Sequence, residues 1–256
     1  MAQYWIRPDS AELGNQPADF AALYSHSGSF TVVEIGGEYC FHLNSSGSHT
    51  ARTIVRYLPA GEVADAEVYV LGFRSPPGVG APHAMAALRA AAGVMTCYQA
   101  GWNGDLMTTY LGRLVNNTPA RLSTDDGPAG RDDYYAGFGS IYGNVVTGRQ
   151  LRFGNASSFA DLGDPTNDHS DTALDSQITG VGWVGVTTRS ASEAYIYAIG
   201  IGTDGDPAPT GPVEVSAEPF LLRHNPRTNK VIPVLSSPTV TDIGANCVRP
   251  RVTKGY

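Results

Sequence analysis

Short runs in which apolar and polar residues alternate recur along the chain. Gly, Pro, Asn or Asp separates the runs, a pattern typical of half-buried strands in a β-sandwich or barrel. The sequence therefore predicts an almost all-β fold. We expect strands near residues 29–35, 38–43, 51–57, 64–73, 83–90, 94–101, 105–111, 149–153, 181–188 and 194–201.

Two segments need a separate interpretation. Asn103-Gly104 lies between two of the runs, and Asn-Gly readily adopts the positive φ angles of a type I′ turn, so we expect a hairpin there. Residues 83–93, HAMAALRAAAG, have high helix propensity. Because this segment is short, has no convincing N-cap and lies between strand-like runs, we predict a strand there too.

Three further stretches organise the chain. Residues 123–144 and 154–171 are rich in Gly, Asp and Ser with a few aromatic residues, which predicts long surface loops, where function often lies. Residues 204–215, DGDPAPTGPVEV, indicate a Pro-rich linker. We therefore divide the chain into a sandwich over 1–209 and a small β appendage over 210–256, suited to docking or assembly.

Composition narrows the range of functions. Thirty glycines and seventeen prolines supply frequent turns, and charged residues make up only 16% of the chain. A net charge of −7 without a Lys/Arg cluster argues against a nucleic-acid partner. No basic segment followed by an apolar one opens the chain, and no eighteen apolar residues are consecutive. We expect synthesis in the cytoplasm and no membrane insertion.

The three cysteines, Cys40, Cys97 and Cys247, lie far apart in the sequence and are odd in number. None takes part in a CxxC or His/Cys spacing that would indicate a zinc site. We expect them to be buried free thiols.

Several segments carry a resemblance to a known family over roughly residues 1–209. They are the opening QYWIRPDSAELGNQPADFAALY, the run VADAEVYVLGFRS, the hairpin TCYQAGWNGDLMTTYLGR, the pair LRFG and ITGVGWVGV, and the closing AYIYAIGIGTDGDPAP. Together they resemble a concanavalin-A-like, laminin-G-like jelly-roll domain of structural proteins of tailed bacteriophages and phage-like particles. The resemblance implies two curved antiparallel sheets packed face to face, with a concave face that binds glycans in many members.

Alternation along two of the runs predicts a ligand face. Asp65, Glu67 and Tyr69 alternate with small apolar residues, as do Glu193, Tyr195 and Tyr197, so each set points to one side of its strand. Rings and carboxylates together suit sugars, although each tyrosine alone is also explained by ordinary packing. The predicted ligand-binding residues are Asp65, Glu67, Tyr69, Trp102, Tyr195 and Tyr197, with Tyr134, Tyr135 and Tyr142 as second candidates.

Catalysis is not indicated. Glycan hydrolases of the superfamily carry Glu-x-Asp-x-Glu on one strand, whereas Glu62 precedes Asp65 by three residues and would point to the opposite face without a bulge. The sequence has no GxSxG motif, no GxGxxG followed by a helix and no Walker motif. We predict no catalytic residues and no enzyme activity.

Calcium is the one cofactor for which the sequence offers candidate ligands. Asp164, Asp168 and Asp171 supply hard oxygen atoms within eight residues, and Asp204 with Asp206 forms a second group. Neither group matches an EF-hand loop, and Asx turns are the alternative explanation.

These observations predict a non-enzymatic virion component: a head or tail decoration, spike or fibre protein that contacts host surface polysaccharide. Its partners would be other virion proteins and further copies of itself, such as a trimer. Two alternatives remain open. One is a capsid or tail cement protein without glycan binding, and the other is a glycan hydrolase of the concanavalin-A-like superfamily.

Overall fold

The structure is a computed structural model that describes residues 2–25, 28–45, 52–73, 84–103, 108–125, 134–154, 156–188, 192–212, 221–225 and 230–234. Its contacts divide the chain into two units, Met1–Val213 and Glu214–Tyr256. The described helices are two single 3₁₀ turns, η1 (Ser10–Glu12) and η2 (Phe159–Asp161). Within these ranges no helix is long and apolar enough to cross a membrane.

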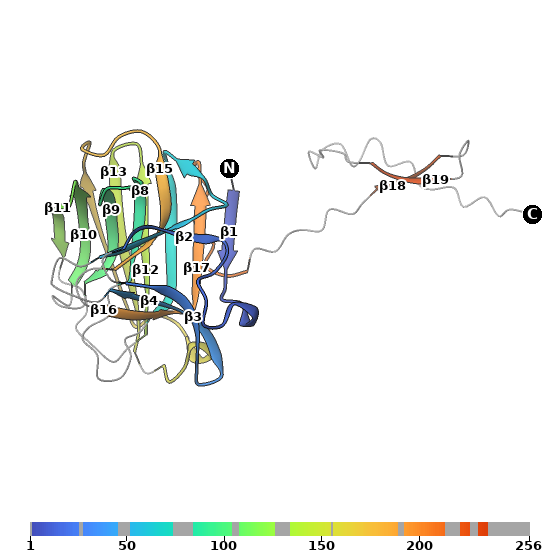
Figure 1. The fold of residues 1–256 in the computed structure, drawn as a ribbon, viewed down its shortest axis with the longest axis horizontal. Helices are drawn as coiled ribbons and strands as arrows, with labels where there is room; N and C mark the ends of the chain where they lie inside the picture. Colours follow the sequence, from blue (N-terminus) through green and yellow to red (C-terminus); the bar gives the residue numbers. More distant parts are fainter. Residues whose placement is uncertain are drawn as a thin grey trace, which may run out of the picture. The chain divides into compact units, whose positions relative to one another are not determined.

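The first unit is built of three antiparallel sheets, and Figure 1 labels many of their strands. The six-stranded sheet has the order β1 (Ala2–Ile6), β17 (Ala198–Thr203), β7 (Ala66–Phe73), β12 (Tyr134–Tyr142), β13 (Val145–Phe153) and β14 (Asn167–Leu174). The eight-stranded sheet has the order β11 (Thr118–Asp125), β10 (Thr108–Val115), β9 (Cys97–Asn103), β8 (Met85–Ala90), β15 (Gly182–Thr187), β5 (Thr53–Tyr57) and β2 (Phe20–Ser25), with β6 (Glu62–Val63) paired to β15. The third sheet has the order β16 (Ser192–Ile196), β4 (Glu38–Ser45) and β3 (Phe30–Ile35).

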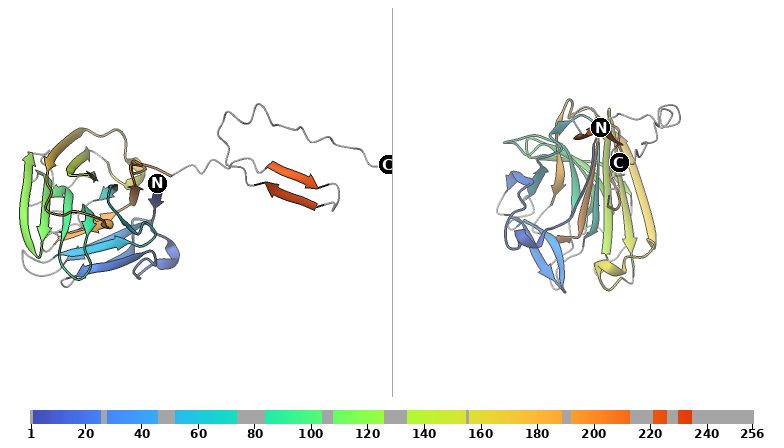
Figure 2. Two further views of the ribbon diagram at one scale, coloured as in Figure 1. Left: turned by 90° about the horizontal axis from the view of Figure 1, so that it is seen from above. Right: turned by 90° about the vertical axis from the view of Figure 1, so that its right-hand side faces the viewer.

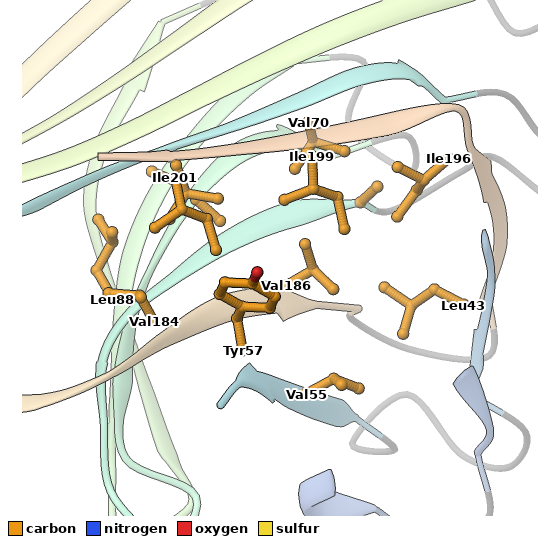
Figure 3. Packing of buried hydrophobic residues seen from close by; sticks show 14 of the residues in the cluster. Leu43, Val55, Tyr57, Val70, Leu88, Val184, Val186, Ile196, Ile199 and Ile201 are labelled. Atoms are coloured by element: carbon orange, nitrogen blue, oxygen red, sulfur yellow. The ribbon is translucent and has the colours of Figure 1, made fainter. Parts of the chain in front are cut away.

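One core joins the inner faces of all three sheets. Alternate residues of each strand point inward, as a strand period of two requires. Val68 and Val70 of β7 belong to the same core cluster as residues of the eight-stranded and three-stranded sheets. The labelled core side chains in Figure 3 are Leu43, Val55, Tyr57, Val70, Leu88, Val184, Val186, Ile196, Ile199 and Ile201. The layered arrangement is seen from two further directions in Figure 2.

The two large sheets approach each other closely at Gly139 of β12. A Cβ atom at this position would lie 2.5 Å from Cβ of Ala86 on β8 and 2.8 Å from Cβ of Ala100 on β9. Neither neighbour is the end of a flexible side chain, so only glycine fits without moving a strand. The small residues of YYAGFGSIY therefore belong to a central strand of the fold.

Several predicted elements are confirmed. Residues 85–90 form β8, a strand, despite their helix propensity, because all six residues are buried between neighbouring strands β9 and β15. A hairpin does join β9 to β10, but its register pairs Asn103 with Thr108, so Asn103 ends β9 and the expected two-residue Asn-Gly turn was wrong. The connecting residues lie outside the described ones. Cys40 and Cys97 are buried free thiols, while Cys247 lies outside the described residues.

Three predictions were wrong. The stretch 123–144, predicted to be a loop, contains the end of β11 and the whole of β12, and the stretch 154–171 contains the start of β14. Glycine was taken as a loop signal, but Gly139 of β12 is required by the close approach of the two large sheets. The single strand expected over 194–201 is two strands in different sheets, β16 and β17, which meet at Tyr197.

The second unit contains a two-stranded antiparallel sheet of β18 (Leu221–Asn225) and β19 (Lys230–Val234). The appendage expected over 210–256 thus contains two strands, and residues 235–256 lie outside the described ones. Its proposed docking role stays a prediction.

Substituting Gly139→Ala should lower the free energy of unfolding by roughly 1–3 kcal/mol, the cost of overpacking a filled core. Gly163→Ala is the matched control, because no atom lies within 4 Å of its added Cβ, and its effect should stay within about 0.5 kcal/mol. Urea unfolding followed by circular dichroism measures both. Equal effects of the two substitutions would contradict the sheet contact.

Candidate ligand-binding cleft

Val68 and Val70 point into the core. The residues that alternate with them, Glu67, Tyr69 and Leu71, therefore point to the outer face of the six-stranded sheet. The opposing residues on β12 and β13 share that face, and the result is a cleft with a volume of about 500 Å³. We call it the Tyr69 cleft. It is lined by Tyr69, Leu71, Phe138, Arg149, Leu151, Phe153, Phe159, Leu162, Pro165, Tyr197 and Thr210.

The floor and the walls of the cleft come from different parts of the chain. Strands β7, β12 and β13 form the floor through side chains that are neighbours across the strands, such as Tyr69 and Phe138, while the exposed Arg149 of β13 lies at the rim. The walls come from η2 and the residues after it, from the β16–β17 junction at Tyr197, and from Thr210.

Aromatic contacts tie the walls to the floor. The rings of Tyr69 and Phe138 stack with centroids 4.2 Å apart, and those of Phe159 and Tyr197 stack at 5.0 Å. Tyr134 of β12 meets Phe159 edge to face at 4.8 Å and thereby anchors η2 to the sheet. Ring pairs of this kind add about 0.5–1.5 kcal/mol each beyond their buried area.

Two arginines pack on the same group of rings. Cζ of Arg149 lies 5.5 Å from the Phe138 centroid, and its Nε and Nη2 groups donate to the two carboxylate oxygens of Asp168 at 2.8 and 2.6 Å. The exposed Arg7 places its Cζ 4.0 Å from the Tyr197 centroid. An arginine over a ring keeps N–H groups available at its edge for a further acceptor.

The segment 206–212 folds back over β17 and supplies one wall. Gly200 and Gly202 of β17 allow this, because a Cβ on either would collide with backbone atoms of Asp206, Pro207 or Pro209. The Gln3 side chain fixes the segment by donating to the Pro207 carbonyl at 2.9 Å. The glycines of AIGIGT are therefore required by a chain crossing.

Glu67 holds the same segment from the cleft side. Its Oε1 accepts a hydrogen bond from the Ala208 backbone N–H at 3.2 Å. Burial raises the pKa of Glu67 above its ordinary value of 4.5, and the Ala208 hydrogen bond and the Arg149 charge oppose that rise. Burial likewise raises the pKa of Tyr69, whose side chain is only 4% exposed.

The structure brings some of the six predicted ligand residues together and separates others. Tyr69 and Tyr197 line the cleft, and Glu67 lies beside it. Tyr195 packs against the same aromatic cluster but contacts His42 on β4, with ring centroids 5.2 Å apart. Trp102 lies on β9 of the other large sheet, and its side chain is outside the described residues.

Asp65 holds together one end of the sandwich. Its Oδ1 accepts from the Gly143 N–H at 2.8 Å and from Nη2 of the buried Arg89 at 3.4 Å. Arg89 also donates to the carbonyls of Ala64, Ile178 and Gly143 at 2.7–3.0 Å. Asp65 therefore has a structural role, because its contacts join four chain segments. It does not line the cleft.

The second-choice tyrosines have three different environments. Tyr135 is fully buried in the core, and Tyr134 is buried with its hydroxyl donating to the Ser157 carbonyl at 3.3 Å. Tyr142 is 36% exposed at the end of β12 and does not line the cleft. Tyr134 therefore supports the cleft wall, and Tyr142 offers a control position on the same strand.

The calcium candidates do not gather into one group. Asp168 binds Arg149, and Asp171 Oδ1 accepts from the Thr172 N–H at 2.8 Å. Asp204 and Gly205 have positive φ angles in a turn closed by the Asp206 N–H and the Thr203 carbonyl at 3.1 Å, while Asp164 is exposed in the loop before β14. Among the described residues no three His, Cys, Asp or Glu side chains converge as a metal site. Calcium binding stays a prediction.

Sequence reasoning missed most of the cleft. Two of the missed residues, Phe138 and Phe159, lie in stretches that were predicted to be loops. Arg149 was expected to be the first residue of a strand. No pattern in the sequence therefore linked these residues to Tyr69. Tyr134, Phe138 and Tyr142 are aromatic residues four apart in a run of small residues, which matches a strand that shows its large side chains on one face. That alternation was the available signal.

Comparison with solved structures shows the fold. Lectin II from Ulex europaeus superposes with a TM-score of 0.52 at 8% identity over 79% of this chain and 98% of the lectin. The lectin UEA-II complexed with galactose gives 0.52 at 9% identity over 79% and 98%. The chain has the concanavalin-A-like jelly-roll fold.

A carbohydrate-binding module is also similar to the chain. The CBM2 module of the evolved Dit protein of Lactobacillus casei BL23 phage J-1 gives a TM-score of 0.44 at 14% identity, over 80% of this chain and 99% of the module, a score too low to support an argument. No protein-family model and no curated protein matches the chain.

The raised pKa of Glu67 predicts a pH dependence of stability. At low pH the carboxyl is protonated in both the folded and the unfolded state, whereas above pH 4.5 the unfolded state ionises first, so folding becomes less favourable until pH exceeds the folded-state pKa. Glu67→Gln keeps an acceptor for Ala208 but does not titrate. The stability of Glu67→Gln relative to the unaltered protein should therefore rise between pH 4 and pH 7 in urea unfolding. A constant difference would contradict the raised pKa.

Proposed function

We propose that the protein binds glycans through the Tyr69 cleft and that it does so as a non-enzymatic component of a virus particle, such as a decoration, spike or fibre protein. The glycan part rests on the cleft. The particle part rests on the resemblance of residues 1–209 to structural proteins of tailed bacteriophages.

The observation that carries the proposal is the make-up of the cleft. Its volume of about 500 Å³ is in the range of roughly 300–1,000 Å³ for small-molecule sites. Apolar and aromatic side chains form most of the lining, and a few polar groups converge on it: the Tyr69 and Tyr197 hydroxyls, the Arg149 guanidinium and the Thr210 hydroxyl. A sugar site needs apolar and polar groups together, because the C–H faces of a sugar are apolar and its hydroxyls require hydrogen-bond partners.

Arg149 is the polar group best placed to meet a ligand. Its side chain is 46% exposed, and the single carboxylate of Asp168 occupies two of its five N–H groups. The remaining donors suit sugar hydroxyls at the rim. On the floor of the cleft, the Tyr69 hydroxyl is a second polar group for a ligand, since no described residue forms a hydrogen bond with it.

The same lining supports binding without catalysis. Hydrolysis of a glycosidic bond requires two carboxyl groups facing one cleft at about 5–9.5 Å. None of the described residues that line the Tyr69 cleft is Asp or Glu, Glu67 is engaged with Ala208, and Asp65 is engaged with Arg89. These contacts give the nearest carboxylates structural roles.

Replacing Arg149 with methionine should weaken glycan binding by about tenfold or more, because a hydrogen bond to a charged group contributes about 1.5–3 kcal/mol. Stability should change by less than about 1 kcal/mol, since Arg149 and Asp168 form an exposed ion pair. Arg121→Met, at an exposed arginine of β11 in the other sheet, is the matched control.

The measurement is a binding screen of the purified full chain against host cells and their extracted surface polysaccharide, alongside a test for shortening of the polysaccharide. Binding that is reduced by Arg149→Met but not by Arg121→Met supports the proposal. Shortening of the polysaccharide would contradict its non-enzymatic part. A folded protein that binds no glycan would favour the cement role.

A further inference from the structure

The interior of the Tyr69 cleft is mostly apolar. The floor is formed by Leu71, Leu151 and Phe153, and Leu162 and Pro165 face them from the wall. Arg149 and Thr210 are exposed at the rim, and the Tyr69 hydroxyl is the polar group of the buried part of the lining. A ligand that enters the cleft therefore meets donors at the rim and hydrocarbon below.

The rings of the cleft offer little free face for stacking against a sugar. Tyr197 is packed against both Phe159, at 5.0 Å between centroids, and Cζ of Arg7, at 4.0 Å from its centroid. Phe138 is packed against Tyr69 at 4.2 Å and approached by Arg149 at 5.5 Å. The cleft thus presents ring edges and leucine side chains, which contact compact apolar groups well.

A sugar without substituents fits this interior poorly. A sugar hydroxyl that is buried against leucine loses its hydrogen bond to water. If it gains no new hydrogen bond, binding is weakened on the order of tenfold. A methyl group in the same place strengthens binding by about fourfold. The lining therefore favours a sugar whose buried side carries methyl groups.

We propose that the glycan bound by the Tyr69 cleft carries methyl-bearing substituents, namely acetamido, O-acetyl or 6-deoxy groups, which occupy the floor next to Leu71, Leu151 and Leu162. This inference rests on the proposed function and names its ligand class. The sugar hydroxyls and ring oxygen face Arg149 and Thr210 at the rim. Leu162 follows η2 on the wall and is only partly buried, so it determines how well the methyl group is covered.

The test compares matched glycans that differ in the methyl-bearing group. The full chain is titrated, by biolayer interferometry, against protein conjugates of L-fucose and L-galactose and of N-acetylglucosamine and glucose. The third arm is host polysaccharide before and after mild alkaline removal of O-acetyl groups. We expect the methyl-bearing member of at least one arm to bind at least about fourfold more tightly, and the arm that responds identifies the substituent. Equal or weaker binding of the methyl-bearing member in all three arms would overturn the inference.

Leu162→Ser tests the location of the methyl group. The variant should reduce the preference for the methyl-bearing glycan toward equal affinity, while Leu58→Ser, at a leucine that is 38% exposed and does not line the cleft, should keep it. Thermal unfolding checks that both variants are folded. An unchanged preference in Leu162→Ser would place the methyl contact elsewhere and overturn the inference.

The failure of this inference is distinguishable from the failure of the proposed function. If the protein binds both members of every pair equally and Arg149→Met abolishes that binding, the cleft binds glycans but does not select methyl groups. If neither member of any pair nor the host polysaccharide binds, the proposed function itself is wrong, and the inference with it.

Discussion

Burial of the inner faces of the two large sheets is the contact on which the rest of the molecule depends. Val68 and Val70 of β7 are fully buried against the opposite layers, and a strand period of two then directs Tyr69 to the outer face. A shift of one residue in β7 would exchange these sets and place a tyrosine and a glutamate in the core. The Tyr69 cleft therefore exists because the hydrophobic core holds its register.

Close approach of chain segments determines where the side chains that line the cleft lie. Gly139 lets β12 lie against β8 and β9, and this position on the sheet sets where Phe138 emerges beside Tyr69. Gly200 and Gly202 let residues 206–212 cross β17 and form a wall. A turn-based interpretation of the composition misses both roles of glycine, and the contact at Gly139 joins segments that are distant in sequence.

The carboxylates near the cleft bind other groups of the protein, and this determines the chemistry that the cleft lining offers. Asp65 joins chain segments through Arg89 and Gly143, Glu67 holds Ala208, and Asp168 orients Arg149. Each of these carboxylates has a protein partner, and the lining itself consists of hydrocarbon, rings, hydroxyls and one exposed guanidinium. Such a surface suits recognition of a partly apolar sugar better than acid–base chemistry on it.

The sequence by itself determined the all-β class, the strand at residues 83–90, the hairpin at Asn103 and the outward direction of Glu67, Tyr69 and Tyr197, because these follow from local alternation and turn chemistry. Tertiary structure alone decided which of those outward residues meet. Tyr69 joins Phe138, Arg149 and Phe159 only because β7, β12 and β13 are neighbours in the sheet, and Asp65 is drawn away to Arg89. Strand order and chain crossings depend on contacts between residues far apart in the sequence, and periodicity within a single strand carries no information about them.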